Sequence, residues 1–187
     1  VENYIRYLES GNLIYQSWPV DMAGKKVLKA RPKIYIADAA IRNAVLMDDA
    51  LLTDPVQLGK IVETAVYKHA ASFYDKKATT VGYFRGGRKN KEIDIVVERP
   101  QKANILIEVK YRENAVIPND DAISELADTA AAAFVLTKNP PDCGIQQTAS
   151  GAPLLRLPAS AFLYLLGHEE RHDANHSTRA HERSRFP

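Results

Sequence analysis

Three carboxylates and one lysine stand on alternate positions of two short segments that have the residue pattern of strands. Glu92 and Asp94 belong to the first segment, and Glu108 and Lys110 belong to the second. Because side chains alternate between the two faces of a strand, the four groups are expected on one face of a sheet, with aliphatic side chains on the other. Carboxylates on rigid strands suit a partly hydrated Mg²⁺, which neutralises a phosphodiester and activates a bound water. A nearby lysine can orient or deprotonate that water. The pattern therefore indicates metal-dependent phosphodiester chemistry.

A simpler interpretation of alternating charges is a strand with one face in water, where ion pairs between neighbours contribute little. Leu106 argues against it, because this apolar side chain falls on the charged face. After Lys110 the chain also returns to a helix and then to a compact apolar strand at 134–136. These features are typical of central strands covered on both faces, where acidic side chains require a reason.

The elements around the two segments predict an α/β protein with a mixed, α+β-like sheet. A helix is expected over 55–72, and three strands over 79–85, 91–97 and 104–110, with short connections that favour antiparallel hairpins. The residues 119–121 are expected to cap a helix over 122–132, which is followed by the strand 134–136. A last strand at 153–157 and a last apolar helix at 158–166 complete this part of the chain.

The first 50 residues predict a helix that stops at Gly11, followed by short strands at 13–18, 27–28 and 34–36. Helix followed by a twisted hairpin is the layout of the second half of a winged helix. After residue 167 the composition turns polar and rich in histidine, which is typical of a disordered tail. The expected domains are thus a partial winged-helix region at 1–50, a main domain at 51–167 and a tail at 168–187. The abrupt helical start without a methionine suggests a piece of a longer chain.

At Asp94 and Glu108-Val109-Lys110 the chain resembles the Asp…Glu-x-Lys signature of the PD-(D/E)XK restriction-endonuclease-like superfamily. The order helix, three strands, helix, strand is similar to the α-β-β-β-α-β core of that superfamily. The resemblance implies that Asp94, Glu108 and Val109 hold Mg²⁺ or Mn²⁺. It also implies catalysis by Asp94, Glu108 and Lys110, with support from Glu92 or from Glu63 on the preceding helix.

A closer resemblance covers most of residues 1–167. The segments 13–15, 31–35, 83–85, 92–94 and 107–110 look like the C-terminal region of a prokaryotic group of AAA-type ATPases. In that group a P-loop ATPase is followed by a winged helix and a nuclease-like domain, so the resemblance implies an upstream ATPase domain as partner. This chain has Asp38-Ala39-Ala40-Ile41 where the group usually has Asp-Thr-Gly-Leu. It contains no phosphate loop of its own, so ATP is expected only through the upstream domain.

Two polar residues of the long helix, Glu63 and His69, lie at different positions relative to its apolar face. The apolar residues Leu58, Ile61, Val62, Ala65 and Val66 recur on one helical face, which places Glu63 about 130° away from the centre of that face. Glu63 is therefore either a member of the site or a plain surface residue. His69 continues the apolar face and is expected to be a packed core histidine.

Basic residues form two clusters that predict sequence-independent contacts with DNA phosphates. The clusters consist of Lys25, Lys26, Lys29, Arg31 and Lys33 in the first half, and of Arg85, Arg88 and Lys89 at the hairpin turn. Solvated loops are the alternative. The net charge of +2, the single Cys143 and the lack of a membrane-length apolar stretch predict a cytoplasmic protein without a membrane partner.

Three functions remain at this point. The first is a Mg²⁺-dependent DNA phosphodiesterase domain. The second is a catalytically idle nuclease fold that binds DNA or protein and regulates or targets the ATPase. The third is a docking domain that regulates the ATPase and touches no nucleic acid.

Overall fold

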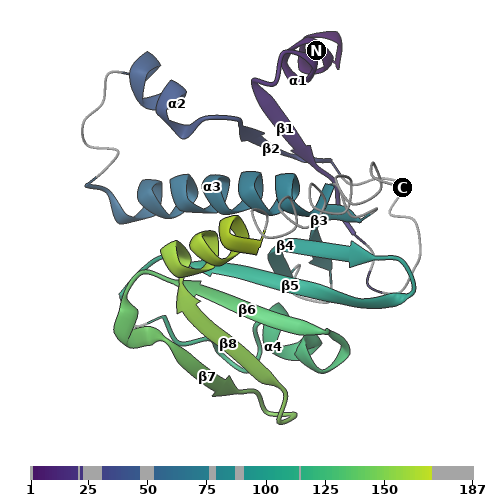
Figure 1. Ribbon diagram of the computed structural model, residues 1–187, viewed down its shortest axis with the longest axis vertical. Helices are drawn as coiled ribbons and strands as arrows, with labels where there is room; N and C mark the ends of the chain where they lie inside the picture. The colour runs from purple at the N-terminus through teal and green to yellow at the C-terminus, as the bar shows by residue number, and fades with distance from the viewer. Residues whose placement is uncertain are drawn as a thin grey trace, which may run out of the picture.

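The computed structural model describes residues 2–20, 22, 31–46, 53–75, 79–86, 91–113 and 115–169. These residues form a six-stranded mixed sheet and a separate two-stranded hairpin, shown in Figure 1. The strands are β1 Ile14–Ser17, β2 Lys33–Ile36, β3 Thr80–Gly86, β4 Lys91–Arg99, β5 Lys102–Lys110, β6 Ala132–Thr137, β7 Gly144–Gln147 and β8 Pro153–Pro158. The helices are α1 Glu2–Ser10, α2 Ala39–Leu46, α3 Pro55–Asp75, α4 Ala122–Leu126 and a last helix over 159–169, with the 3₁₀ turns η2 Ala127–Thr129 and η3 Pro140–Asp142.

The sheet has the order β3-β4-β5-β6-β8-β7. The pairs β3–β4 and β4–β5 are antiparallel, as the short connections predicted. The pairs β5–β6 and β6–β8 are parallel, and β7 runs antiparallel at the edge. The element order α3, β3, β4, β5, α4, β6 thus follows the expected succession of helix, three strands, helix and strand. The edge strand β7, which is mostly exposed and has few apolar residues, was not expected.

Both faces of the central strands are covered, as Leu106 had indicated. On one face α3 and the last helix pack against Ile95 and Ile107. On the other face α4 packs against Val96 and Leu106, and Leu106 is fully buried. The central strands β4 and β5 are thus covered on both faces (Figure 1).

A bulge changes the expected alternation of β4. Gly82 of β3 pairs with Val96, but Phe84 pairs with Ile93, so β4 uses three residues where β3 uses two. An extra residue shifts the following side chains to the opposite face. Ile93 therefore packs in the cluster with Val96 rather than with Ile95, and the expectation of one aliphatic face for all the odd positions was wrong. Asp94 lies next to this bulge.

The helix α3 also turns a different face to the sheet than its apolar pattern predicted. Its buried residues are Val66, Tyr67 and Ala70, whereas His69 is exposed, so the prediction of a packed core histidine was wrong. The Tyr67 ring stacks on Tyr35 of β2, with ring centroids 4.2 Å apart. A face centred near Tyr67 includes the position one turn earlier, which is Glu63.

Two further boundaries differ from the sequence-based expectation. The helix predicted over 122–132 ends at Leu126 and passes through η2, because Ala132 already belongs to β6. The last helix continues to residue 169, beyond its expected end at 166. Residues 170–187 of the predicted tail and the predicted strand 27–28 lie outside the described residues.

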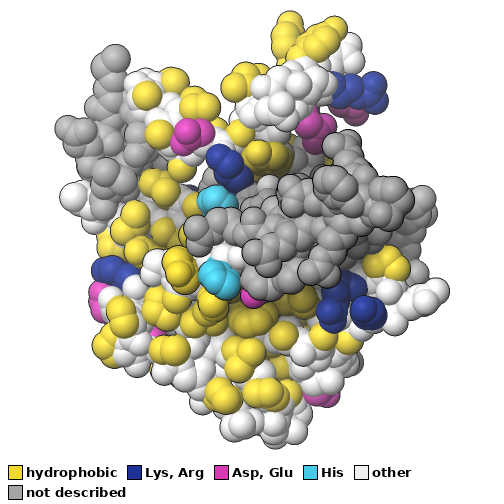
Figure 2. Space-filling model, viewed as in Figure 1, with side chains coloured by type: hydrophobic (Ala, Val, Ile, Leu, Met, Phe, Trp, Pro, Cys, Tyr) yellow, Lys and Arg dark blue, Asp and Glu magenta, His cyan; other side chains and the backbone are white. Residues whose placement is uncertain are grey.

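The N-terminal hairpin is joined to the sheet by hydrogen bonds rather than by α1. β1 and β2 are antiparallel, with Ile14 opposite Ile36. Val20 donates its N–H to the carbonyl of Tyr83 in β3 at 2.7 Å, and Tyr83 donates back to the carbonyl of Trp18 at 3.1 Å. By contrast, α1 has no buried residue, and its exposed apolar side chains lie at the top of Figure 2.

None of the described helices is long and apolar enough to cross a bilayer.

Replacing Gly82 with alanine should disrupt the attachment of the hairpin to β3. A Cβ at this position would lie 2.2 Å from the Trp18 carbonyl oxygen and 2.7 Å from a Val20 methyl group. Since overpacking of this kind costs about 1–3 kcal/mol, G82A should lower the free energy of unfolding by that amount in urea titrations. The control G59A meets no atom within 4 Å. It should instead stabilise α3 by about 0.5–1 kcal/mol. Equal stability of G82A and the parent would contradict the proposed contact.

Candidate functional site

Two acidic side chains replace backbone acceptors where β4 and β5 stop pairing. The ladder between these strands ends at Ile95 and Ile107, while β4 continues to pair with β3 and β5 with β6. Beyond that point, Val109 donates its N–H to Asp94 Oδ2 at 2.9 Å, and Asp94 donates its own N–H to Glu108 Oε2 at 3.3 Å. The backbone of each strand thus donates to an acidic side chain of the other strand, which positions Asp94 and Glu108 close together.

Glu63 and Glu92 join this pair through Lys33 of the hairpin. The Lys33 ammonium lies 3.3 Å from Glu63 Oε1 and 3.6 Å from Asp94 Oδ1, and it also forms an ion pair with Glu92. The Tyr35 hydroxyl donates to Glu63 Oε1 at 2.7 Å. Glu63, which the sequence left between a site residue and a surface residue, is therefore part of the acidic cluster formed by Glu63, Glu92, Asp94 and Glu108.

Lys110 lies on the other side of this acidic cluster. Its ammonium pairs with Glu108 Oε1 and lies 3.8 Å from Asp121 Oδ2. Sequence reasoning treated Asp121 only as a helix cap, which it is, because its side chain accepts from the Ile123 N–H. Its contact with Lys110 could have been expected from the chain order: α4 follows β5 directly, so the N-cap of α4 can lie near the end of β5.

An open cavity of about 390 Å³ gives access to the side of the acidic cluster near Lys110. Its lining consists of Lys91, Glu92, Asp94, Glu108, Lys110, Pro118, Asp120, Asp121 and Ala122. Neither Lys33 nor Glu63 belongs to this lining. The cavity therefore reaches the Asp94–Glu108 pair from the side of β5 and α4, while Lys33 contacts Asp94 without lining that cavity.

Burial strongly disfavours negative charge on the central pair. The Glu108 side chain is 5% exposed and that of Asp94 is 16% exposed. Burial, followed by repulsion from Glu63, raises the pKa of Asp94 to about 6. Burial, followed by repulsion from Asp94, raises the pKa of Glu108 to about 8. The charges on Lys33 and Lys110 are thus too few to hold both carboxylates fully ionised at neutral pH.

The two lysines remain charged because the carboxylates around them favour the protonated form. Burial by itself would lower their pKa values, but the surrounding carboxylates outweigh burial and raise the pKa of both Lys33 and Lys110. The pKa of Glu92 is lowered, because hydrogen bonds and ion pairs with Lys33 and Arg85 outweigh its burial. At neutral pH both lysines are donors rather than proton acceptors.

The donor set fits a hard divalent cation that keeps part of its water shell. Within the described residues, no three His, Cys, Asp or Glu side chains group closely enough to enclose a metal ion. Mg²⁺ needs no such enclosure, because it is usually held by one or two carboxylates together with waters and substrate phosphates. Asp94 and Glu108 supply two such carboxylates at an open cavity, and burial together with repulsion from neighbouring carboxylates raises the pKa of both. Val109 is adjacent to this pair through its N–H bond to Asp94.

The predicted basic clusters are only partly described. Lys25, Lys26, Lys29, Arg88 and Lys89 lie outside the described residues. Arg31 is exposed, and its carbonyl accepts a hydrogen bond from the buried Tyr83 hydroxyl at 2.8 Å. Lys33 was grouped with the surface lysines but contacts three carboxylates. Arg85 donates from Nε to Glu92 Oε2 at 2.7 Å and lies over the Tyr83 ring.

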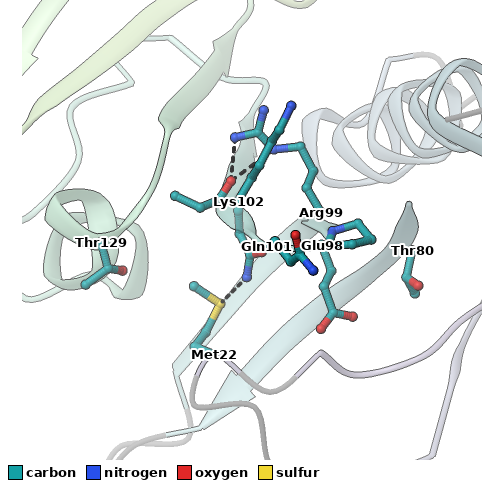
Figure 3. A pocket seen from close by; sticks show the side chains of 10 residues that line it. Met22, Thr80, Glu98, Arg99, Gln101, Lys102 and Thr129 are labelled. Carbon is teal, nitrogen blue, oxygen red and sulfur yellow. Dashed lines mark hydrogen bonds between the residues drawn. The ribbon is translucent and has the colours of Figure 1, made fainter. Parts of the chain in front are cut away.

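A second cavity of about 450 Å³ lies at the turn between β4 and β5, as Figure 3 shows. Two contacts join groups of its lining: Arg99 donates to the Ala103 carbonyl at 3.0 Å, and the Asn104 amide lies 3.6 Å from the Met22 sulfur (Figure 3). This cavity shares no lining residue with the acidic one. We therefore assign the candidate site to the acidic cluster.

Removing the Glu108 carboxylate should change how stability depends on pH. A pKa raised from 4.5 to about 8 on folding means that the stabilising effect of protonation is complete below about pH 4.5 and is lost as the pH rises through 8. Without divalent cations, E108Q should therefore gain stability relative to the parent between pH 5 and 8.5, by at least ~1.4 kcal/mol, which corresponds to one pKa unit. Urea unfolding at several pH values measures this difference.

The matched control for this pH series is E113Q. Glu113 is an exposed acid whose pKa is lowered by Lys138. Its contribution should therefore change only below pH 4.5 and be constant across the tested range. Parallel stability curves for E108Q and the parent would contradict the charged, buried pair.

Comparison with known proteins assigns the chain to a family without assigning an activity. Residues 1–52 match the model of a domain of unknown function, DUF8612, and residues 58–157 match that of another, DUF4143. Neither curated proteins nor solved structures gave a match. Since the second match spans more than half of the 187 residues, the chain belongs to the DUF4143 family.

Proposed function

We propose that the acidic cluster is the active site of a Mg²⁺-dependent phosphodiesterase domain that acts on DNA. The observation that carries this proposal is the placing of the Asp94 and Glu108 carboxylates by the backbone N–H groups of Val109 and Asp94, beside Lys110 at an open cavity. Carboxylates on a solvent-exposed strand would be neither buried nor raised in pKa, as Asp94 and Glu108 both are.

Asp94 and Glu108 would hold the metal ion, with Val109 as the third residue of the implied ligand set. The bound ion would neutralise the scissile phosphodiester and lower the pKa of a water. Glu92 and Glu63 would support the site by holding Lys33 in place.

Lys110 has a narrower role in this proposal than its residue type alone allows. Because its pKa is raised, it carries a proton at neutral pH and acts as a donor. It would orient the attacking water and stabilise negative charge on the phosphoryl oxygens, rather than remove a proton.

The fold and the order of the acidic residues support a nuclease-like origin. The succession α3, β3, β4, β5, α4, β6 and the spacing of Asp94, Glu108 and Lys110 are similar to the PD-(D/E)XK superfamily. We extend the proposal accordingly to a restriction-endonuclease-like core.

The family also supports a partner. The DUF4143 domain is commonly found in the C-terminal regions of AAA ATPases. We propose that an ATPase domain of the same polypeptide presents DNA to this site, with ATP bound by that domain. The exposed Arg31 and the predicted basic clusters would add contacts to DNA phosphates that do not depend on sequence.

One observation favours a second candidate function, a nuclease fold that binds DNA or protein without cleaving. Lys33 already brings a cation to three of the carboxylates, so the acidic cluster is partly neutralised without any metal. In that case the domain would regulate or target the ATPase through binding alone.

A cleavage assay distinguishes the two functions. With Mg²⁺ or Mn²⁺ the purified chain should nick supercoiled plasmid or degrade single strands. K110A should lose at least about a hundredfold in rate, the usual effect of removing one donor that stabilises transition-state charge. Folding should persist, as measured by circular dichroism.

The control for this assay is K138A, which removes a lysine paired with the exposed Glu113. It should cleave at the parent rate. Salt-sensitive DNA binding without cleavage in either metal would contradict the phosphodiesterase and support the binding module.

A further inference from the structure

Lys33 occupies a position in the acidic cluster that is separate from the open cavity. Its ammonium contacts Glu63, Glu92 and Asp94, which come from α3 and β4. The cavity is lined instead by Glu108 and Lys110, together with two of the Lys33 partners, Glu92 and Asp94. Asp94 is thus shared: its Oδ1 lies 3.6 Å from the Lys33 ammonium, and it lines the cavity beside Glu108, whereas Glu63 contacts Lys33 and does not line the cavity.

We infer that the Lys33 ammonium permanently fills one of two cation positions in the acidic cluster, so that the site takes one divalent ion rather than two. The inference rests on the proposed metal-dependent function and concerns how many ions that function uses. The remaining position is the one between Asp94 and Glu108, which the cavity opens to solvent.

The contacts of Lys33 are those of a cation held by its surroundings. Three carboxylates converge on one nitrogen, whose side chain is 20% exposed. The Tyr83 ring adds a further favourable contact, with the ammonium 5.3 Å from the ring centroid. A lysine paired with a single carboxylate on an exposed surface would gain far less electrostatic stabilisation.

The backbone around Lys33 is also fixed. Two residues before it, the carbonyl of Arg31 accepts from the buried Tyr83 hydroxyl. Two residues after it, Tyr35 stacks on Tyr67 and donates to Glu63. The backbone is thus fixed before and after Lys33, so its ammonium is directed at the carboxylates by the fold and not by a chance side-chain conformation.

This placement makes the site common to both family-matched segments. Lys33 and Tyr35 belong to the segment 1–52, whereas the four carboxylates belong to the segment 58–157. The second segment without the first would have the acids but would lack one of the cations that hold them.

Counting bound Mn²⁺ tests the inference without reference to activity. Titration calorimetry of the whole chain with Mn²⁺, checked by the paramagnetic resonance signal of free Mn²⁺, should give one ion per chain. K33M keeps most of the side-chain volume but removes the charge, and it should bind two ions. K33R keeps the charge and K138M removes a charge elsewhere, so both should still bind one.

The outcomes separate this inference from the proposed function. A folded K33M that binds one ion, or a parent chain that binds two, would overturn the inference alone. A parent that binds none while K33M binds one would overturn both the one-ion count and the metal-dependent function. No binding by either would overturn both.

A second variant keeps the test decisive should K33M fail to fold. E63Q removes the Lys33 partner that does not line the cavity, and it leaves the Asp94–Glu108 pair intact. It should retain the single Mn²⁺. Loss of that ion in folded E63Q would show that the metal competes for the Lys33 position, which contradicts the inference.

Discussion

The site depends on the point where β4 and β5 stop sharing backbone hydrogen bonds. Asp94 and Glu108 take over as acceptors there, so the same two side chains both hold the strand ends and carry the charge of the site. Each carboxylate is thereby fixed in direction, and neither can turn toward water without leaving a backbone N–H unpaired. The requirement to satisfy buried donors thus brings two like charges together.

The surrounding residues offset the cost of that arrangement. Burial removes hydration from both carboxylates, and repulsion from Glu63 acts on Asp94 and repulsion from Asp94 acts on Glu108, so both pKa values are raised. Lys110 lies on the β5 side of the pair and Lys33 on the side of α3, so each acid has a cation within reach. The balance is incomplete, and the pKa values of both acids stay raised.

The N-terminal hairpin is part of this electrostatic arrangement. It is held to β3 by backbone hydrogen bonds at Tyr83 and to α3 by the stacking of Tyr35 on Tyr67. These contacts carry Lys33 to the acids and bring Tyr35 to Glu63. The hairpin and the sheet thus form one site, although they match two different family models.

Much of the fold and the centre of the site follow from the sequence alone. Alternation along β4 and β5, short connections and the Asp121 cap are local features, so they identify the strands, the antiparallel pairs and the triad of Asp94, Glu108 and Lys110. The bulge that moves Ile93 to the other face, the rotation of α3 that brings Glu63 inward and the arrival of Lys33 come only from the tertiary structure. The reason is physical: local periodicity reports which face of an element is apolar, whereas these three features depend on packing between residues far apart in the chain.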